Sequence, residues 1–359
     1  MDFVVCVQCY TYNHASYILD AMNGFTMQKT AFPYVCIIVD DASTDGEQEV
    51  ISKYLNDYFD LLDKRVVRNE ETDDYIMTFA QHRTNKNCFF AVYYLKYNHY
   101  RKKDKAQYFK GFSDNAKYIA LCEGDDYWTD PLKLQTQVEI MQNNPNYSFC
   151  HTGFDYYYDG ADLFQSGMSH TETNLKILDS KEDVKFCILD GNRYRVQTMT
   201  ALFPSSLYYE VMKERPTNWS NFIMGDTPLW ILLLGKGDVC FIDRKMAVYR
   251  IHDNSACRPN NTLNKLRFTL LSEEMRITIG EHILLEEDKK RILQKRYNTS
   301  LIHYISFDPN FKPIIEPHFT SIFEEKMFQA RISLFGRLLT RLTLKVKKQI
   351  IGITKRIVL

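Results

Sequence analysis

The fold is decided by a stretch that reads Tyr34-Val35-Cys36-Ile37-Ile38-Val39, followed by Asp40-Asp41-Ala42-Ser43-Thr44-Asp45-Gly46. A run of apolar, β-prone residues is typical of a strand buried on both faces, and the abrupt change to acidic and small polar residues indicates a loop. A helix is then predicted, because apolar residues recur on one helical face at Val50, Ile51, Tyr54, Leu55 and Tyr58. A strand, a polar loop and a helix in this order indicate a parallel α/β sheet.

The same order occurs on both sides of this stretch. Upstream, residues 3–7 form an apolar run, residues 11–13 are polar, and a helical spacing of apolar residues follows. Downstream, residues 117–122 form a third apolar run, which ends in Glu123-Gly124-Asp125-Asp126. Ligands of parallel sheets bind beyond the carboxyl ends of the strands, so these loops are predicted to line a binding site. Residues 61–110 have weak periodicity and are predicted to form helix and connections.

The composition bounds the class of protein. The chain has 359 residues, and its 45 basic and 45 acidic residues give a formal net charge of zero. Proteins that bind nucleic acid generally carry a basic excess, so no nucleic-acid partner is expected. No secretory signal is visible, nor any apolar run of about 18 residues that could span a membrane. The nine cysteines are scattered and odd in number, which favours reduced thiols and a cytoplasmic location.

Acidic residues cluster at three predicted loop or pre-helical positions: Asp40 and Asp41, the segment 123–126, and Asp226. In the second cluster, Gly124 lets the backbone turn tightly, so that the carboxylates on either side can face one point. Mg²⁺ and Mn²⁺ bind a few carboxylates together with the phosphate oxygens of a substrate. The cluster therefore suits a metal–diphosphate complex, although solvated surface acids are the common alternative.

Several motifs accompany these loops in a fixed order. They are TYN at 11–13, QKT at 28–30, VDDASTD at 39–45, YIALCEGDDYW at 118–128, PLKLQ at 131–135, MGDTPLW at 224–230 and YRIHDNS at 249–255. In order and spacing they resemble the motifs of the family 2 glycosyltransferases of the bacterial surface-polysaccharide type, which have the GT-A fold. The resemblance implies an α/β, Rossmann-like fold with a mainly parallel central sheet flanked by helices, followed by a helical C-terminal extension.

The resemblance also implies roles for individual residues. Asp41 is expected to contact the nucleotide base, and Asp226 to be the catalytic base. Residues expected to bind the nucleotide sugar are Thr11, Asn13, Asp40, Asp41, Asp125, Arg250 and His252. Residues expected to hold a divalent metal, Mn²⁺ or Mg²⁺, are Glu123, Asp125, Asp126 and His252.

The chain departs from the family pattern at three places. Tyr10 stands where the family has proline, an A-R-N element is absent before the third strand, and Gly225 replaces an acid beside Asp226. Other interpretations stay open. Asp40 and Asp45 could cap the following helix, which we favour for Asp45, and Asp226 could be a helix cap, a base or both. We expect His14 to be structural, while ligand and structural roles for His252 are equally favoured.

The function implied by the resemblance is transfer of a sugar from a nucleoside-diphosphate donor to a hydroxyl of a glycan or lipid-linked acceptor, with inversion, in cell-surface polysaccharide biosynthesis. One alternative is a nucleotidyltransferase, which generally has a Gly-rich, basic phosphate loop near the first strand; residues 11–16 contain no glycine, lysine or arginine. The other is a catalytically silent protein that binds sugar nucleotides or acts as a membrane scaffold.

The chain is predicted to have three parts. Residues 1–256 would form the GT-A domain, with a nucleotide-sugar half (1–130) and an acceptor half (131–256), followed by a helical extension (257–326) and a basic amphipathic tail (327–359). The tail has eight basic and no acidic residues among apolar ones, which is typical of a helix that lies on anionic lipid. We therefore expect a peripheral location at the inner face of the cell membrane; packing of the tail on protein is the alternative.

Overall fold

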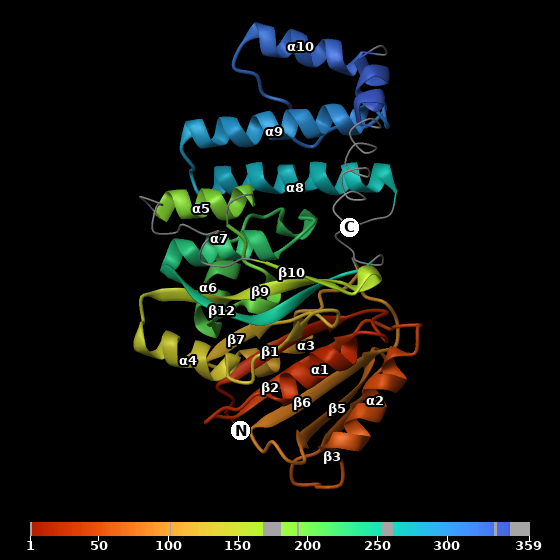
Figure 1. Ribbon diagram of the computed structural model, residues 1–359, viewed down its shortest axis with the longest axis vertical. Helices are drawn as coiled ribbons and strands as arrows, with labels where there is room; N and C mark the ends of the chain where they lie inside the picture. Colours follow the sequence, from red (N-terminus) through yellow and green to blue (C-terminus); the bar gives the residue numbers. More distant parts are fainter. Residues whose placement is uncertain are drawn as a thin grey trace. The chain divides into compact units, whose positions relative to one another are not determined.

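The computed structural model describes residues 2–100, 102–167, 181–191, 194–252, 261–333 and 336–344 (Figure 1). Contacts divide them into two compact units. The first unit contains the described residues up to 215 together with residues 229–252. The second contains residues 216–228 and the described residues from 261 onwards.

The first unit contains one large sheet and the helices around it. Its strands are β1 (Val5–Thr11), β2 (Tyr34–Asp40), β3 (Phe59–Asp60), β4 (Arg68–Glu71), β5 (Tyr75–His82), β6 (Cys88–Leu95), β7 (Tyr118–Leu121), β8 (Tyr127–Trp128), β9 (Tyr147–Tyr158), β10 (Leu163–Ser166), β11 (Leu202–Pro204) and β12 (Asp238–Ile251). Its helices are α1 (Ile18–Thr26), α2 (Glu47–Tyr58), α3 (Gln107–Ser113), α4 (Lys133–Asn143), α5 (Lys181–Asp190), α6 (Ser205–Glu214) and most of α7 (Asp226–Lys236).

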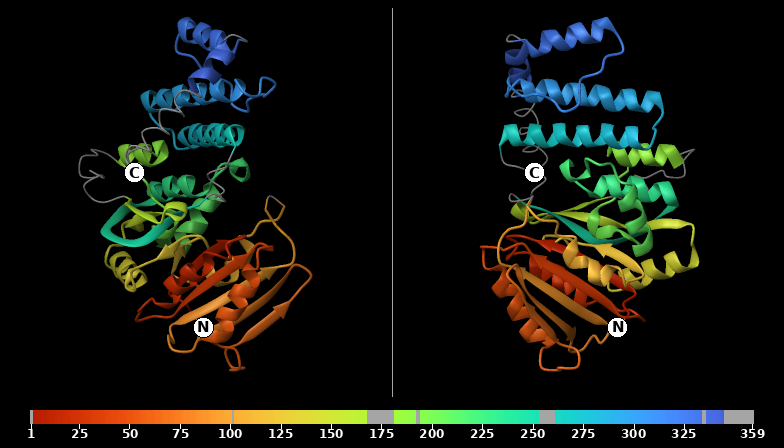
Figure 2. Two further views of the ribbon diagram at one scale, coloured as in Figure 1. Left: turned by 45° about the vertical axis from the view of Figure 1, so that its right-hand side comes forward. Right: turned by 180° about the vertical axis from the view of Figure 1, so that it is seen from behind.

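The strand order is β3-β5-β6-β2-β1-β7-β11-β9-β12-β8. The four central strands, β6, β2, β1 and β7, are parallel neighbours, and antiparallel strands extend the sheet on both sides. β9 and β12 form a further parallel pair along most of their lengths, and Figure 2 shows them from two sides. The predicted α/β class is confirmed, and the parallel part of the sheet is its centre.

Both faces of the central strands are buried, as the apolar runs predicted, and β2 is buried at every position. On one face, Tyr10 packs edge-on against Phe109 of α3, with the ring centroids 4.7 Å apart. On the other face, Phe25 of α1 packs against Phe90 of β6 at 6.3 Å and against Trp128 of β8 at 5.0 Å. Helices therefore cover both faces, and only the strand ends are left for polar loops.

The prediction of helix and connections for residues 61–110 was wrong over most of that range. The segment forms β4, β5 and β6, and only α3 at its end is helical. The cause is cross-strand packing: Phe79 of β5 stacks on Phe89 of β6 with the centroids 5.8 Å apart, and Tyr75 packs edge-on against Tyr93 at 5.2 Å. Aromatic residues on neighbouring strands stabilise an antiparallel pair that local periodicity does not reveal.

The second unit is mainly helical, which confirms the helical C-terminal region. It contains α8 (Thr262–His282), α9 (Glu287–Ile305) and α10 (Ile322–Ile332), and residues 336–344 are also helical. Helices α8 and α9 pack against each other, as both views in Figure 2 show. Asn261 caps α8, because its side chain accepts a hydrogen bond from the Asn264 N–H at 2.7 Å. Among the described residues, no helix combines the length and the apolar character that a membrane crossing requires.

Candidate active site

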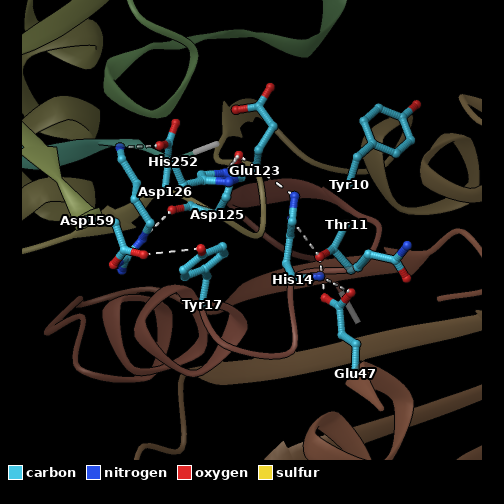
Figure 3. A network of polar contacts seen from close by, with 12 residues as sticks. Tyr10, Thr11, His14, Tyr17, Glu47, Glu123, Asp125, Asp126, Asp159 and His252 are labelled. Carbon is cyan, nitrogen blue, oxygen red and sulfur yellow. Dashed lines mark hydrogen bonds and ion pairs between the residues drawn. The ribbon is translucent and has the colours of Figure 1, made fainter. Parts of the chain in front are cut away.

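The polar loops predicted to line a site do meet at one edge of the sheet. β1 and β2 are parallel and in register, with Thr11 opposite Asp40, so both strands end at the same level. β7 is the parallel neighbour of β1 on its other side, and the segment 123–126 follows it directly. Figure 3 shows the side chains at this edge.

One buried carboxylate, that of Glu47 at the start of α2, connects the first two loops. It accepts a hydrogen bond from the Thr11 hydroxyl, and it accepts further bonds from the His14 N–H and from the Ser43 hydroxyl, both at 2.8 Å. The Ser43 oxygen in turn accepts the N–H of Asn13 at 2.8 Å. Burial raises the pKa of Glu47 to about 7, although these donors oppose the shift. The loops after β1 and β2 are therefore held together by one acidic group.

Asn13 adds a second connection between the same loops. Its backbone is in the left-handed region, with φ 57°, which asparagine tolerates better than most residues. Its side-chain oxygen accepts the N–H of Thr44 at 2.8 Å. Asp45, which we expected to be a cap, accepts the N–H of Glu47 at 3.2 Å and the N–H of Ala15 at 2.9 Å. Its carboxylate therefore reaches both loops.

The two aspartates that end β2 have different surroundings. Asp40 accepts the Ser43 N–H at 3.1 Å and a side-chain bond from Gln48, and burial raises its pKa. Asp41 accepts the His99 N–H at 2.6 Å and the Lys105 ammonium at 2.8 Å. Asp40 therefore braces its own loop, while both oxygens of Asp41 are engaged by the segment before β7.

The loop after β7 approaches the end of β1 very closely. The Gly124 N–H donates to the Tyr10 carbonyl at 2.9 Å. A Cβ atom at position 124 would lie 2.2 Å from the Thr11 hydroxyl oxygen and 2.6 Å from its Cβ. Only glycine permits this approach, which brings Asp125 over the loop that follows β1.

Asp125 meets two histidines from distant parts of the chain. One oxygen of Asp125 lies 3.1 Å from Nε2 of His252, which follows β12, and 3.8 Å from Nε2 of His14, in the loop after β1. Burial acts to raise the pKa of Asp125, but the hydrogen bond from His252 and the charge of His14 outweigh it and leave the pKa below its ordinary value. Burial lowers the pKa of His14.

These three side chains fit a divalent cation. Each offers one ligand atom, the three atoms lie within 4.8 Å of one another, and among the described residues this is the one such group of histidine, cysteine and acidic side chains. A carboxylate and imidazole nitrogens are suitable ligands for Mn²⁺ and related metals. Nδ1 of His252 is buried and has no hydrogen-bond partner within the described part of the chain. Nε2 of His252 is the nitrogen that faces Asp125 and could reach a metal, while among the described residues no acceptor orients the ring through Nδ1.

The other two predicted metal ligands lie differently. Asp126 is buried and accepts the Arg250 N–H at 2.8 Å, and burial together with the charges of Asp125 and Glu123 raises its pKa well above the ordinary value. In Figure 3 the Glu123 side chain extends away from His14, Asp125 and His252. The structure thus brings Asp125 and His252 together with His14, and leaves Asp126 and Glu123 outside that group.

Arg250, at the end of β12, holds the acidic loop of residues 123–126 in place. Its guanidinium donates to the Asp125 carbonyl at 3.0 Å and to the Asp20 carboxylate at 2.5 Å, and it lies 3.5 Å from Asp159. It also lies over three tyrosine rings, at 4.8 to 5.3 Å from the centroids of Tyr17, Tyr127 and Tyr157. A buried cation held by so many groups has little freedom, so we assign Arg250 a positioning role.

Asp226 is the first residue of α7 and belongs to the second unit. Its carboxylate accepts the N–H of the next residue, Thr227, at 2.7 Å, whereas a helix-capping side chain accepts the N–H two or three residues further along. Burial raises its pKa, while the bonds from Thr227 and the charge of Arg276 oppose the rise. A raised pKa is compatible with a base that has to accept a proton.

Three residues at this edge of the sheet take part in the candidate site although they were not assigned to it from the sequence. His14 was expected to be structural, and Glu47 and Lys105 were not singled out. A signal existed for His14, because it directly follows the TYN motif on a strand-end loop. Glu47 directly follows the VDDASTDG stretch and begins a helix. An acidic residue there has an ordinary explanation, because its negative charge interacts favourably with the helix dipole. Lys105 lies in the segment without a recognisable motif, so no signal pointed to it.

Residues 6–79 match the family described as Glycosyl transferase family 2. These residues run from β1 into β5 and include both loops that Glu47 connects. Over this segment, the match agrees with the resemblance that the motifs carry.

Two mycobacterial proteins are similar to the chain over a longer range. They are the uncharacterized proteins Rv1520 of Mycobacterium tuberculosis (strain ATCC 25618 / H37Rv) and Mb1547 of Mycobacterium bovis, each 29% identical over 243 residues. The similarity covers 67% of this chain and 57% of each relative, so the chain spans less than two thirds of the length of these curated relatives.

Solved structures with a similar course of the chain have low sequence identity. TarS 1-349 of S. aureus in complex with UDP-GlcNAc is 13% identical, with 84% of this chain and 73% of that chain covered and a TM-score of 0.48. Mannosyltransferase PcManGT of Pyrobaculum calidifontis, in complex with GDP-Man and Mn²⁺, is 11% identical, with 95% and 84% covered and a TM-score of 0.48. Neither likeness decides what this chain binds.

Proposed function

We propose that the protein transfers a sugar from a nucleoside-diphosphate donor to a hydroxyl group of a glycan or lipid-linked acceptor, with inversion at the anomeric carbon. The observation that carries this proposal is the meeting of the loops after β1, β2 and β7 at one edge of the sheet. The first two of these loops lie in the segment that matches the glycosyltransferase family. Such an edge is where α/β sheets bind their ligands.

The nucleotide would lie against the loops of Thr11, Asn13 and Asp40, with Asp41 facing the base. Glu47 and Asn13 hold these loops in place before any ligand arrives. Because Asp41 already accepts a hydrogen bond from Lys105, a base N–H has to share that carboxylate with the ammonium or displace it. Lys105 is therefore part of the proposed base-binding surface.

The diphosphate would be bound through a divalent metal held by Asp125 and His252. The metal, when bound, neutralises the charge that develops on the departing nucleoside diphosphate. Arg250 contributes by fixing the Asp125 carbonyl with its guanidinium and the Asp126 carboxylate with its backbone N–H, so that the acidic loop keeps its position. Asp126, whose pKa is raised well above its ordinary value, and Glu123 belong to the same loop but not to the group that Asp125 forms with the histidines.

Asp226 is the proposed base. The acceptor hydroxyl oxygen forms a bond to the anomeric carbon, the bond from that carbon to the β-phosphate oxygen breaks, and the electron pair leaves with the nucleoside diphosphate. The proton of the hydroxyl passes to the Asp226 carboxylate. One in-line displacement of this kind inverts the anomeric configuration, and it requires the carboxylate within hydrogen-bond reach of the attacking hydroxyl.

The setting we propose is cell-surface polysaccharide biosynthesis at the cytoplasmic face of a membrane, with the C-terminal segment resting on anionic lipid. One helical segment, residues 336–344, contains three leucines that are each more than half exposed: Leu338, Leu339 and Leu342. Arg337 and Arg341 lie in the same helical segment. Exposed leucines together with basic residues are typical of a helix that lies in a membrane interface.

A thermal-shift screen tests the donor part of this proposal. Purified full-length protein is heated with UDP, GDP, dTDP or CMP, each with Mn²⁺, Mg²⁺ or EDTA. A ligand at about 100 times its dissociation constant stabilises the folded state by about 2.7 kcal/mol, which such a screen detects. We expect one nucleoside diphosphate to stabilise the protein only with metal. If folded protein responds to none of them, the sugar-nucleotide proposal is overturned.

A further inference from the structure

The position of His14 suits a metal ligand, although we predicted a structural role for this residue from the sequence. His14 lies in the loop between β1 and α1. Its side chain is mostly buried at the edge of the sheet to which the loop containing Asp125 also belongs. Figure 3 shows His14 between the Thr11–Glu47 pair on one side and Asp125 on the other. The ring therefore joins the nucleotide loop to the acidic loop.

The hydrogen bonds on one side of the ring determine which nitrogen carries the proton. The Thr11 hydroxyl donates its single proton to the Glu47 carboxylate. Towards Nδ1 of His14, which is 3.2 Å away, the Thr11 oxygen can therefore only accept. While Glu47 is ionised and accepts the Thr11 proton, neutral His14 carries its own proton on Nδ1, which leaves the lone pair of Nε2 directed to the side of Asp125. A hydrogen bond from the far nitrogen to an acceptor that is itself fixed is the usual support of a metal-binding histidine.

His252 approaches the same point from the other end of the first unit. Its Nε2 is 3.1 Å from the Asp125 oxygen that lies 3.8 Å from Nε2 of His14. The two imidazole rings are 5.9 Å apart and nearly perpendicular, and the Tyr17 ring packs on His252 with the centroids 4.7 Å apart. Two imidazole nitrogens and one carboxylate thus converge from β1, β7 and β12, and Tyr17 limits the movement of one of them.

We propose that His14 is the third protein ligand of the divalent cation, so that the site is made of His14, Asp125 and His252. This inference rests on the metal site of the proposed function. Two nitrogen donors shift the preference of a site away from Mg²⁺, which prefers oxygen ligands, and towards Mn²⁺, Co²⁺ and Zn²⁺. Three ligands leave further coordination positions for phosphate oxygens or water. The chain is therefore expected to bind Mn²⁺ before it binds any nucleotide.

The test measures binding of metal alone to metal-stripped, full-length protein. Calorimetry with Mn²⁺ and with Mg²⁺ is expected to show at least tenfold tighter binding of Mn²⁺. His14→Asn keeps a side-chain N–H where Nδ1 donates to Thr11 but has no atom in the place of Nε2. We expect it to weaken Mn²⁺ binding at least tenfold and to change Mg²⁺ binding little. His282→Asn, which removes an exposed histidine at the end of α8, serves as the matched control and is expected to bind Mn²⁺ as the parent does.

A second measurement needs no variant. Electron spin-echo spectroscopy of bound Mn²⁺ detects nitrogen ligands, and the proposal requires the signature of two imidazoles in the parent and of one in His14→Asn. A single imidazole in the parent, or unchanged Mn²⁺ affinity in a folded His14→Asn variant, would overturn the assignment of His14. Because no nucleotide is present, these results are separate from the thermal-shift screen. Metal bound by two histidines with no response to any nucleotide would leave this inference standing while the proposed function fails.

Discussion

Thr11 occupies the space that any side chain at position 124 would need. Its hydroxyl oxygen would lie 2.2 Å from a Cβ atom on Gly124, and the N–H of Gly124 is bonded to the carbonyl of the preceding Tyr10. The ends of β1 and β7 are thus in direct contact at the edge that carries the candidate site. The position of Asp125 depends on this contact, because it is the next residue in the chain.

Gly124→Ala is expected to destabilise the protein by about 1–3 kcal/mol, the range for forcing an extra carbon into packed structure. It is also expected to weaken Mn²⁺ binding, because the turn that presents Asp125 has to move. Chemical denaturation and calorimetry measure the two effects. Gly111→Ala is the matched control, since a Cβ there meets nothing within 4 Å and the position is helical. It should be neutral or stabilising by up to about 1 kcal/mol. Equal behaviour of the two variants would contradict the close approach.

Asp226→Asn is expected to lower kcat by a factor of about 10² to 10⁴, the usual contribution of a general base. The carboxamide keeps the size of the side chain and an oxygen that can accept the Thr227 N–H. Donor binding should therefore be retained, which the thermal-shift assay checks beside a glycosyl-transfer assay. Asp73→Asn, an exposed aspartate between β4 and β5, is the control and should keep full turnover. Unchanged turnover in Asp226→Asn would assign the carboxylate to capping alone.

Lys133 is expected to make stability depend on pH in the alkaline range. Its ammonium is buried, donates to Gln137 at 2.7 Å and lies 4.3 Å from the Trp128 ring centroid. Burial lowers its pKa from 10.5 to about 8, so between these values the unfolded chain holds a proton that the folded chain has released. Stability therefore rises as pH increases from about 8 to 10.5, and the penalty present below pH 8 is about 3 kcal/mol.

Lys133→Met should remove this rise, because methionine fills a similar volume without a charge. Denaturant titrations at several pH values from 7.5 to about 10.5 measure it. Lys53→Met, at an exposed position of α2, should keep the pH dependence of the parent. A Lys133→Met variant with the same alkaline profile as the parent would show that the buried ammonium is not its cause.

The membrane proposal predicts that exposed leucines near the C-terminus are needed for lipid binding. The double variant Leu338→Ser, Leu342→Ser is expected to sediment with anionic vesicles at least tenfold less than the parent, because apolar burial and charge act together there. Binding of the parent should fall as salt rises. Ile314→Ser is the control, since Ile314 is 77% exposed but lies outside the basic segment. An equal loss in the control, or no binding by the parent, would rule against a lipid surface.

The central sheet could be predicted because its strands are buried on both faces and are therefore apolar without interruption. β2 is one example, and its apolar run gives way abruptly to the acidic loop. The antiparallel pair of β5 and β6 could not be predicted in the same way, since its stability comes from pairs such as Phe79 and Phe89 on different strands. Local periodicity contains no information about such pairs.

The site was predictable where a residue type and its place at a strand end were sufficient. Asp125 and His252 were expected near one cation, and the structure places them 3.1 Å apart. A metal-binding role for His14 could not be assigned from the sequence. That role depends on which group the Thr11 hydroxyl donates its hydrogen bond to, and on the distance from His14 to Asp125. Glu47 was missed because its partners come from two loops, and an acid at a helix start has an ordinary explanation.

The connection of two loops through the Glu47 carboxylate has a thermodynamic consequence. The Thr11 hydroxyl, the His14 N–H and the Ser43 hydroxyl are held in fixed positions by this carboxylate. A ligand that binds these loops does not have to order them, so the conformational entropy lost on binding is small and more of the contact energy is retained as affinity. Glu47 thereby makes this edge of the sheet a preorganised surface whose rigidity comes from folding and not from its ligand.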